Sequence, residues 1–250
     1  MNYLQKFEKD GYIIIKNFIN SIHFDNICVS LNKDLNIYCY ENDLNKLGGS
    51  IVGNLNVFPG KYASVIYEEL CKNGFLDLLE EISQKKKNEL DILVGGNLAL
   101  PNKHSQHFHT DGKFEDGMIM CSIATEDVTN ENGPTEIILE SHKQDIPYWK
   151  FLLSKKEKKK LTIKKGDLLI RKHSIWHRGT QNKSHKSRFV IAFLVFDKKR
   201  QMISNLKSKE NLRVYNNFFG NSFYERVKEF LYIYFKVIFV IYKIILSIKK

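Results

Sequence analysis

The stretch KKGDLLIRKHSIWHRGTQNKSHKSRFVIAFLVF, residues 164–196, decides the fold class, because two apolar runs flank a polar turn. Runs of the same kind begin at residue 91 and are separated by turn residues: DILVGGNLAL, SQHFHTD, GMIMCSIAT, TEIILE and KLTIKK. Many short strands at near-regular spacing are typical of an all-β sandwich or barrel. We therefore expect a mainly β core over residues 91–197.

The segments around this core are expected to be mainly helical. A strand is expected at 12–18, a Gly-, Pro- and Asn-rich loop at 46–63, and helices at 3–11, 21–38, 61–72 and 75–84. A long apolar helical pattern closes the sequence. This predicts one domain over residues 1–200, with N-terminal helical elements in residues 1–90, and a helical tail over residues 201–250.

The composition narrows the class of protein. With 43% hydrophobic residues, the 250-residue chain is predicted to be globular rather than disordered. Its formal net charge of +11 indicates either anionic partners or a lysine-rich solvated surface. The basic runs have no interleaved aromatic residues and no recognisable reading module, so we expect no nucleic-acid partner. Four cysteines without paired spacing predict reduced thiols and a cytoplasmic location.

Metal-binding residue types alternate in QHFHTDGKF, residues 106–114. On an extended strand, His107, His109 and Asp111 would share one face. Oxygenases commonly hold iron(II) with two histidines and one carboxylate. His109 and Asp111 supply one of each, and the second histidine must come from elsewhere: His142, His173, His177 or His185.

A chemical argument favours His177 among these. A keto-diacid co-substrate on the metal has a distal carboxylate, for which the forked charge of arginine is the best partner. Arg188 begins the run RFVIAFLVF and follows His177 by eleven residues. That spacing suits a strand, a turn and a return strand.

The segments HTDG, NENGPTEIILESHK and KKGDLLIRKHSIWHRGTQNKSHKSR together resemble the phytanoyl-CoA dioxygenase family of Fe(II)- and 2-oxoglutarate-dependent oxygenases. The resemblance covers residues 3–197, most strongly 95–197. It implies a double-stranded β-helix, the jelly-roll core that is also found in cupins. It further implies that His109, Asp111 and His177 bind Fe(II), and that Arg188 binds the C5 carboxylate of 2-oxoglutarate.

Two polar residues on strands near the expected pocket, Thr135 and Asn97, are expected to offer hydrogen bonds to co-substrate or substrate. The sequence departs from the family at Leu139-Glu140, where Pro-Gly usually precedes Ser-His. The loop before Ser141 is therefore expected to differ, which affects substrate contacts rather than the metal site.

The reaction implied by the resemblance is hydroxylation, with O2 as oxidant and release of succinate and CO2 from 2-oxoglutarate. Related halogenases replace the carboxylate ligand with a small residue, so Asp111 favours hydroxylation. We expect a small-molecule, glycan-precursor or lipid-related substrate. The alternative is a non-catalytic or cupin-like metal-binding protein on the same fold. A cupin-type site would use His107, His109 and a later glutamate, and Glu115 comes one position too late for it.

The remaining histidines have structural interpretations. We expect His107 to be hydrogen-bonded beside the site, His142 to fix its loop, and Trp176 to pack near the metal. Three more are expected on the surface or in loops: His104, His173 and His185.

The apolar tail FLYIYFKVIFVIYKIILSIKK, residues 230–250, places Lys236, Lys243 and Lys250 seven residues apart, so on a helix they form one stripe. Its transfer energy into a bilayer sums to near zero. An interfacial helix with its lysines at anionic headgroups fits better than a span, and packing on the domain or in a dimer is the alternative. Residues 223–250 therefore predict membrane-surface contact at the inner face, with a lipid-linked substrate as a candidate. The oligomeric state is left open.

Overall fold

The computed structural model describes most of the chain, in these ranges: 2–47, 51–200, 204–208, 210–216, 220, 222–235, 237–238, 240–241 and 244–245. All statements below refer to these residues.

The core consists of two antiparallel sheets. The larger sheet has seven strands, in the order β1 (Tyr12–Ile15), β7 (Leu168–Lys172), β4 (Ile119–Ala124), β9 (Arg188–Asp197), β3 (Leu90–Ala99), β2 (Asn54–Phe58) and β10 (Arg213–Val214). The smaller sheet has three, in the order β6 (Lys158–Leu161), β5 (Thr135–Ile138) and β8 (His177–Gly179). Residues of both sheets line one cavity. The mainly β, jelly-roll fold class is thereby confirmed.

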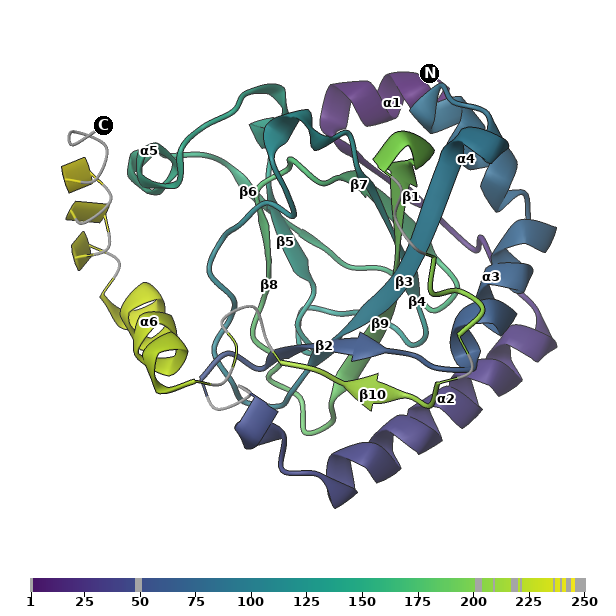
Figure 1. The fold of residues 1–250 in the computed structure, drawn as a ribbon, viewed down its shortest axis with the longest axis horizontal. Helices are drawn as coiled ribbons and strands as arrows, with labels where there is room; N and C mark the ends of the chain where they lie inside the picture. The colour runs from purple at the N-terminus through teal and green to yellow at the C-terminus, as the bar shows by residue number, and fades with distance from the viewer. Residues whose placement is uncertain are drawn as a thin grey trace.

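Helices cover the outer face of the larger sheet (Figure 1). They are α1 (Tyr3–Asp10), α2 (Ile22–Glu41), α3 (Tyr62–Lys72) and α4 (Phe75–Ser83). Strand β9 shows how the two faces are divided, because its side chains alternate. Phe189, Ile191 and Phe193 belong to the core beneath the helices, whereas Val190 and Ala192 face the cavity. The rings of Phe193 and of Phe75 in α4 pack edge to face, with centroids 6.1 Å apart.

The remaining elements are short. Two further helices, α5 (Tyr148–Leu153) and α6 (Phe223–Tyr234), lie on the side of the molecule away from α1 to α4 (Figure 1). Single 3₁₀ turns occur at η1 (Leu44–Leu47), η2 (Lys87–Glu89), η3 (Phe114–Asp116), η4 (Ser141–Lys143) and η5 (Lys198–Arg200).

Two local predictions are wrong. The expected loop at 46–63 contains β2, whose apolar residues Leu55 and Val57 are buried and whose backbone pairs with β3. The Gly, Pro and Asn residues around β2 are typical of loops, so the sequence pattern did not indicate a strand there. Conversely, SQHFHTD forms no regular strand and makes only isolated bridges to its neighbours. The main chain there is held by the edge of the smaller sheet instead of extending it.

Helix α6 packs on the domain. Glu229 is fully buried, and its Oε1 accepts a hydrogen bond from the Val52 N–H at 3.0 Å. The Tyr232 ring lies 5.1 Å from the His107 ring, and the Tyr234 hydroxyl is 2.7 Å from His104 Nε2. No helix in the described part of the chain is long and apolar enough to cross a bilayer. The lysine stripe at positions 236, 243 and 250 lies outside the described residues.

Candidate metal centre

The main chain brings the two distant histidines together. His177 begins β8, and its N–H donates to His109 O at 2.9 Å while the His109 N–H donates to His177 O at the same distance. The pair thus forms an antiparallel bridge, and its side chains project from the same side. Asp111 follows two residues later, with its N–H bonded to His173 O at 3.1 Å. Backbone pairing therefore fixes the spacing of all three side chains.

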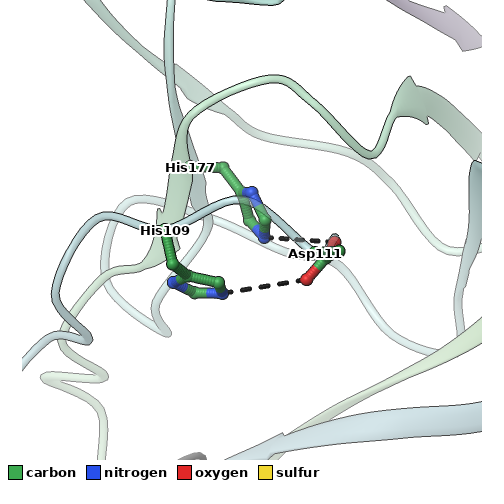
Figure 2. Close-up of side chains that lie close together, drawn as sticks. All are labelled: His109, Asp111 and His177. Carbon is green, nitrogen blue, oxygen red and sulfur yellow. Dashed lines mark ion pairs between the residues drawn. The ribbon is translucent and has the colours of Figure 1, made fainter. Parts of the chain in front are cut away.

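The three side chains converge on one point (Figure 2). Asp111 Oδ1 lies 3.9 Å from His109 Nε2, and Asp111 Oδ2 lies 3.5 Å from His177 Nε2. One ligand atom from each residue falls within 4.8 Å of the other two. Each histidine also places Nδ1 3.0 Å from a main-chain carbonyl, that of residue 107 or 175. Because a carbonyl only accepts, Nδ1 carries the proton and Nε2 presents its lone pair to a metal.

The electrostatics keep the three ligands in the metal-binding protonation state. Burial lowers the pKa of His109, and burial with the nearby Arg171 charge lowers that of His177 well below its usual value. Burial alone would raise the pKa of Asp111, but Arg171 and the two histidines hold it well below its usual range. Two neutral imidazoles and an ionised carboxylate that face one point are the donor set of non-haem iron(II) oxygenases. The residues present therefore fit iron.

Arg171 is a part of this centre that the sequence analysis missed. It lies in β7, is buried, and donates from Nη2 to Asp111 Oδ2 at 2.5 Å. The strand pattern contained the signal: Leu168 and Ile170 pack beneath the helices, so Leu169 and Arg171 must face the other way. A charged residue at an inward position of an apolar strand marks a site.

A cavity of about 650 Å³ extends from the triad between the sheets. Arg188, at the start of β9, lines it together with the two polar candidates Thr135 and Asn97. The Asn97 side chain accepts a hydrogen bond from Asn54 Nδ2 at 2.8 Å, so its oxygen is already engaged. The structure thus brings all six predicted site residues to one cavity, while their individual roles stay predictions.

Arg188 is held by main-chain carbonyls. Its Nη2 donates to Gly133 O at 2.5 Å, whereas the contacts of Nε with Asn132 O and of Nη1 with Asn97 O are long, at 3.4 and 3.5 Å. Burial lowers its pKa to about 10, and Glu126 offsets this only in part. At neutral pH the guanidinium is therefore charged and buried, and a bound anion would offset the cost of burying this charge.

The other histidines are not part of the metal group, although the His107 ring lies 5.4 Å from the His109 ring. His142 is buried against α1, with Nε2 3.1 Å from Glu8 O, as expected for a residue that fixes its loop. His173 lies in the turn after β7, as expected for a loop residue, but not on the surface. It is 3% exposed, and its ring nitrogens lie 2.8 Å from Met118 O and 2.7 Å from Lys113 O, because it anchors the turn after Asp111.

His107 does not join the metal group. Its ring packs against Tyr148 and Tyr232 outside the cavity lining. Glu115 is exposed, and among the described residues the group suited to a metal is His109, Asp111 and His177. A cupin-type set of ligands is thus not assembled. Trp176 is buried nearby and stacks on Phe151, with centroids 4.2 Å apart.

The loop before Ser141 turns through a residue in the left-handed conformation. Glu140 has φ 59°, the left-handed conformation that favours glycine. The Ser141 hydroxyl accepts from the Trp176 N–H at 2.9 Å and donates to Ile138 O at 2.8 Å. Glu140 thus occupies a position whose backbone conformation suits glycine, and the expected difference of this loop from the family stays a prediction.

Comparison with known proteins agrees with this geometry. Residues 91–190 match the phytanoyl-CoA dioxygenase (PhyH) family. No curated protein matches the chain at the level of sequence. The PhyH segment contains both histidines, Asp111, Arg171 and Arg188. The PhyH family uses Fe(II), 2-oxoglutarate and O2, as the sequence resemblance implied.

Solved structures share the fold of the PhyH segment and its surroundings. The carbocyclase SnoK from nogalamycin biosynthesis aligns with a TM-score of 0.62 at 12% identity, covering 78% of this chain and 82% of that chain. The epimerase SnoN, solved with Fe3+, alpha ketoglutarate and nogalamycin RO, aligns with a TM-score of 0.60 at 14% identity, covering 78% and 82%. EvdO2 from Micromonospora carbonacea var. aurantiaca, solved with 2-oxoglutarate, aligns with a TM-score of 0.59 at 10% identity, covering 79% and 91%. The fold is thus that of 2-oxoglutarate-dependent oxygenases.

Proposed function

We propose that the chain is an Fe(II)- and 2-oxoglutarate-dependent dioxygenase that hydroxylates a small-molecule substrate. The observation that carries the proposal is one cavity with two features: three ligand atoms within 4.8 Å of one another, and the buried, charged Arg188. A metal-binding protein without catalysis has no need for the second feature. A 2-oxoglutarate enzyme needs both.

The roles of the residues follow from their positions. His109 and His177 bind Fe(II) through Nε2, and Asp111 binds it through a carboxylate oxygen. Arg188 binds the distal carboxylate of 2-oxoglutarate in a charge-assisted pair, and Thr135 and Asn97 offer hydrogen bonds beside it. When bound, the iron couples the conversion of 2-oxoglutarate and O2 to succinate and CO2 with the transfer of one oxygen atom into a substrate C–H bond.

The cavity walls separate the co-substrate from the substrate. Beyond Arg188, the side chains of β9 that line the cavity are apolar, namely Val190, Ala192 and Leu194, and Met120 of β4 lies beside them. Apolar walls exclude water from the reacting atoms and leave room for the body of a substrate.

The test is anaerobic loading with Fe(II) and 2-oxoglutarate, followed by the visible metal-to-ligand charge-transfer band. We expect a band in the parent and none in His177→Ala, whereas His185→Ala, which changes an exposed histidine, keeps it. A protein that binds Fe(II) but shows no band with 2-oxoglutarate would refute the co-substrate site. Because two neighbours are named as an epimerase and a carbocyclase, ¹⁸O2 labelling then tests hydroxylation: the product must gain one labelled oxygen.

Membrane contact and a lipid-linked substrate at the cytoplasmic face remain separate proposals. Their support is the exposed apolar outer side of the tail, where Phe223 is 85% and Val237 is 72% exposed. Flotation with anionic phosphatidylserine vesicles tests this, comparing the parent with Phe223→Ser/Val237→Ser, which leaves the buried Glu229 in place. Equal flotation of both proteins, or of neither, would remove the proposal.

A further inference from the structure

One buried donor in the cavity wall has no function in the reaction described above. Arg171 is 6% exposed, and Nη2 is bonded to Asp111. Its Nη1 is buried and has no hydrogen-bond partner among the described residues. An unsatisfied charged donor in a protein interior is costly, so it indicates an acceptor supplied from outside the chain.

The strand register places Arg171 away from the co-substrate end of the cavity. Arg171 pairs with Met120, and Met120 pairs with Leu194. Leu194 lies three inward-facing positions beyond Arg188 on β9, which is about 20 Å of strand at roughly 3.4 Å per residue. A five-carbon diacid held by Arg188 is much shorter than this. The Arg171 side chain reaches back towards the metal from the opposite end.

The surroundings of Arg171 at that end are mainly apolar, and the amide of the nearby Asn205 is bonded to the main chain of Val94. Leu93, Met120 and Leu194 line the same level of the cavity and belong to one hydrophobic cluster. The guanidinium of Arg171 donates to Asp111 from Nη2. Among apolar side chains, its Nη1 can then bond only to a small acceptor that enters the cavity. An oxygen that bears negative charge satisfies it best, because both the charge and the fork geometry are then matched.

We propose that Arg171 binds an acidic oxygen of the substrate, and that the substrate is a small molecule with an apolar body and one acidic group held next to the metal. This deepens the proposed function and rests on it. Arg171 then has two roles: Nη2 orients the carboxylate of Asp111, and Nη1 orients the substrate. The net charge of +11 favours the approach of such an anion.

The experiment uses the full chain loaded anaerobically with Fe(II) and 2-oxoglutarate. Hexanoate, hexanesulfonate and neutral hexanamide are titrated while the charge-transfer band is followed, since only binding next to the metal perturbs it. We expect both anions to perturb the band at concentrations about 10-fold or more below those needed for the amide. Arg171→Met should abolish this preference. Lys172→Met is the matched control, because the side chain of Lys172 lies on the opposite face of β7 and pairs with Glu8.

The outcomes separate the alternatives. Equal effects of acid and amide, or an acid preference that survives in Arg171→Met, overturn the proposal. A preference for hexanoate alone shows direct capture by the metal and overturns it too, since sulfonates are weak metal ligands. A higher 2-oxoglutarate requirement in Arg171→Met assigns the residue to the co-substrate, against the proposal.

Two further measurements keep the test decisive. If the parent shows no band, the proposed function fails, and calorimetry of Zn(II)-loaded protein with hexanesulfonate then decides the anion site independently. If Arg171→Met does not fold, Arg171→Lys keeps a cation at Asp111 but loses the second edge. It should lower hexanesulfonate affinity while leaving Zn(II) affinity within about threefold, and unchanged hexanesulfonate affinity overturns the proposal.

Discussion

Replacing Arg188 with methionine should weaken ligand binding but leave the stability of the ligand-free protein nearly unchanged. Its pKa of about 10 corresponds to about 3 kcal/mol of unfavourable charge burial. A bound carboxylate relieves this cost, so its loss should weaken 2-oxoglutarate binding by about 100-fold. In the ligand-free protein the removal of an uncompensated charge offsets the lost bond to Gly133 O. The thermal midpoint should therefore change by less than about 3 °C.

The assay is titration of the charge-transfer band with 2-oxoglutarate, together with thermal unfolding of the metal-free protein. Arg213→Met is the control, since Arg213 is exposed on β10 and its loss should change neither quantity. A 2-oxoglutarate affinity of Arg188→Met within about threefold of the parent would refute the role of the guanidinium. A large fall of the thermal midpoint would show instead that Arg188 mainly holds the turn at Gly133.

Three further results are expected. Asp111→Ala should abolish Zn(II) binding in calorimetry. It should also lower the free energy of unfolding by about 3 kcal/mol, because the buried Arg171 loses its partner. The double variant Asp111→Ala/Arg171→Met should recover part of that loss in urea titrations. Burial lowers the pKa values of His109 and His177, so below about pH 6.5 the unfolded chain binds more protons than the native protein. The stability of the metal-free protein should therefore fall as the pH is lowered from 7 to 5.5. A urea midpoint that does not change with pH would contradict this. Glu229→Ala leaves a buried N–H unpaired and should cost about 1–3 kcal/mol while making α6 sensitive to limited proteolysis, and unchanged protease resistance would show that α6 is held by its aromatic contacts instead.

The chemistry of the site was more predictable than its local structure. The spacing of His177 and Arg188 predicted the site because one residue begins β8 and the other begins β9, so both lie at the start of a strand. The HxD segment was assigned to a strand from its alternation, yet its backbone bonds go to His177, His173 and Gly179, residues that no local pattern identifies. Tertiary pairing decided the conformation there.

Two further features, strand β2 and the docking of α6, were not predicted because they depend on contacts between residues far apart in the sequence. Strand β2 is stabilised by its pairing with β3, about forty residues later, so its own turn-rich composition gave no signal. The contacts that dock α6 include the buried carboxylate of Glu229, a bond from Arg226 to Asn45 O, and rings of the residue 104–107 segment. An apolar tail viewed as sequence does not reveal which of its sides meets the protein.

The position of β9 has a consequence for synthesis of the protein. Strand β9 lies between β4 and β3 and pairs with both, but it is made after them. Until Asp197 has left the ribosome, β3 and β4 therefore each keep one unpaired edge of backbone donors and acceptors. Exposed edges of this kind bind other chains, so fragments that end before residue 188 should aggregate. The larger sheet is thus completed only once β9 has been made.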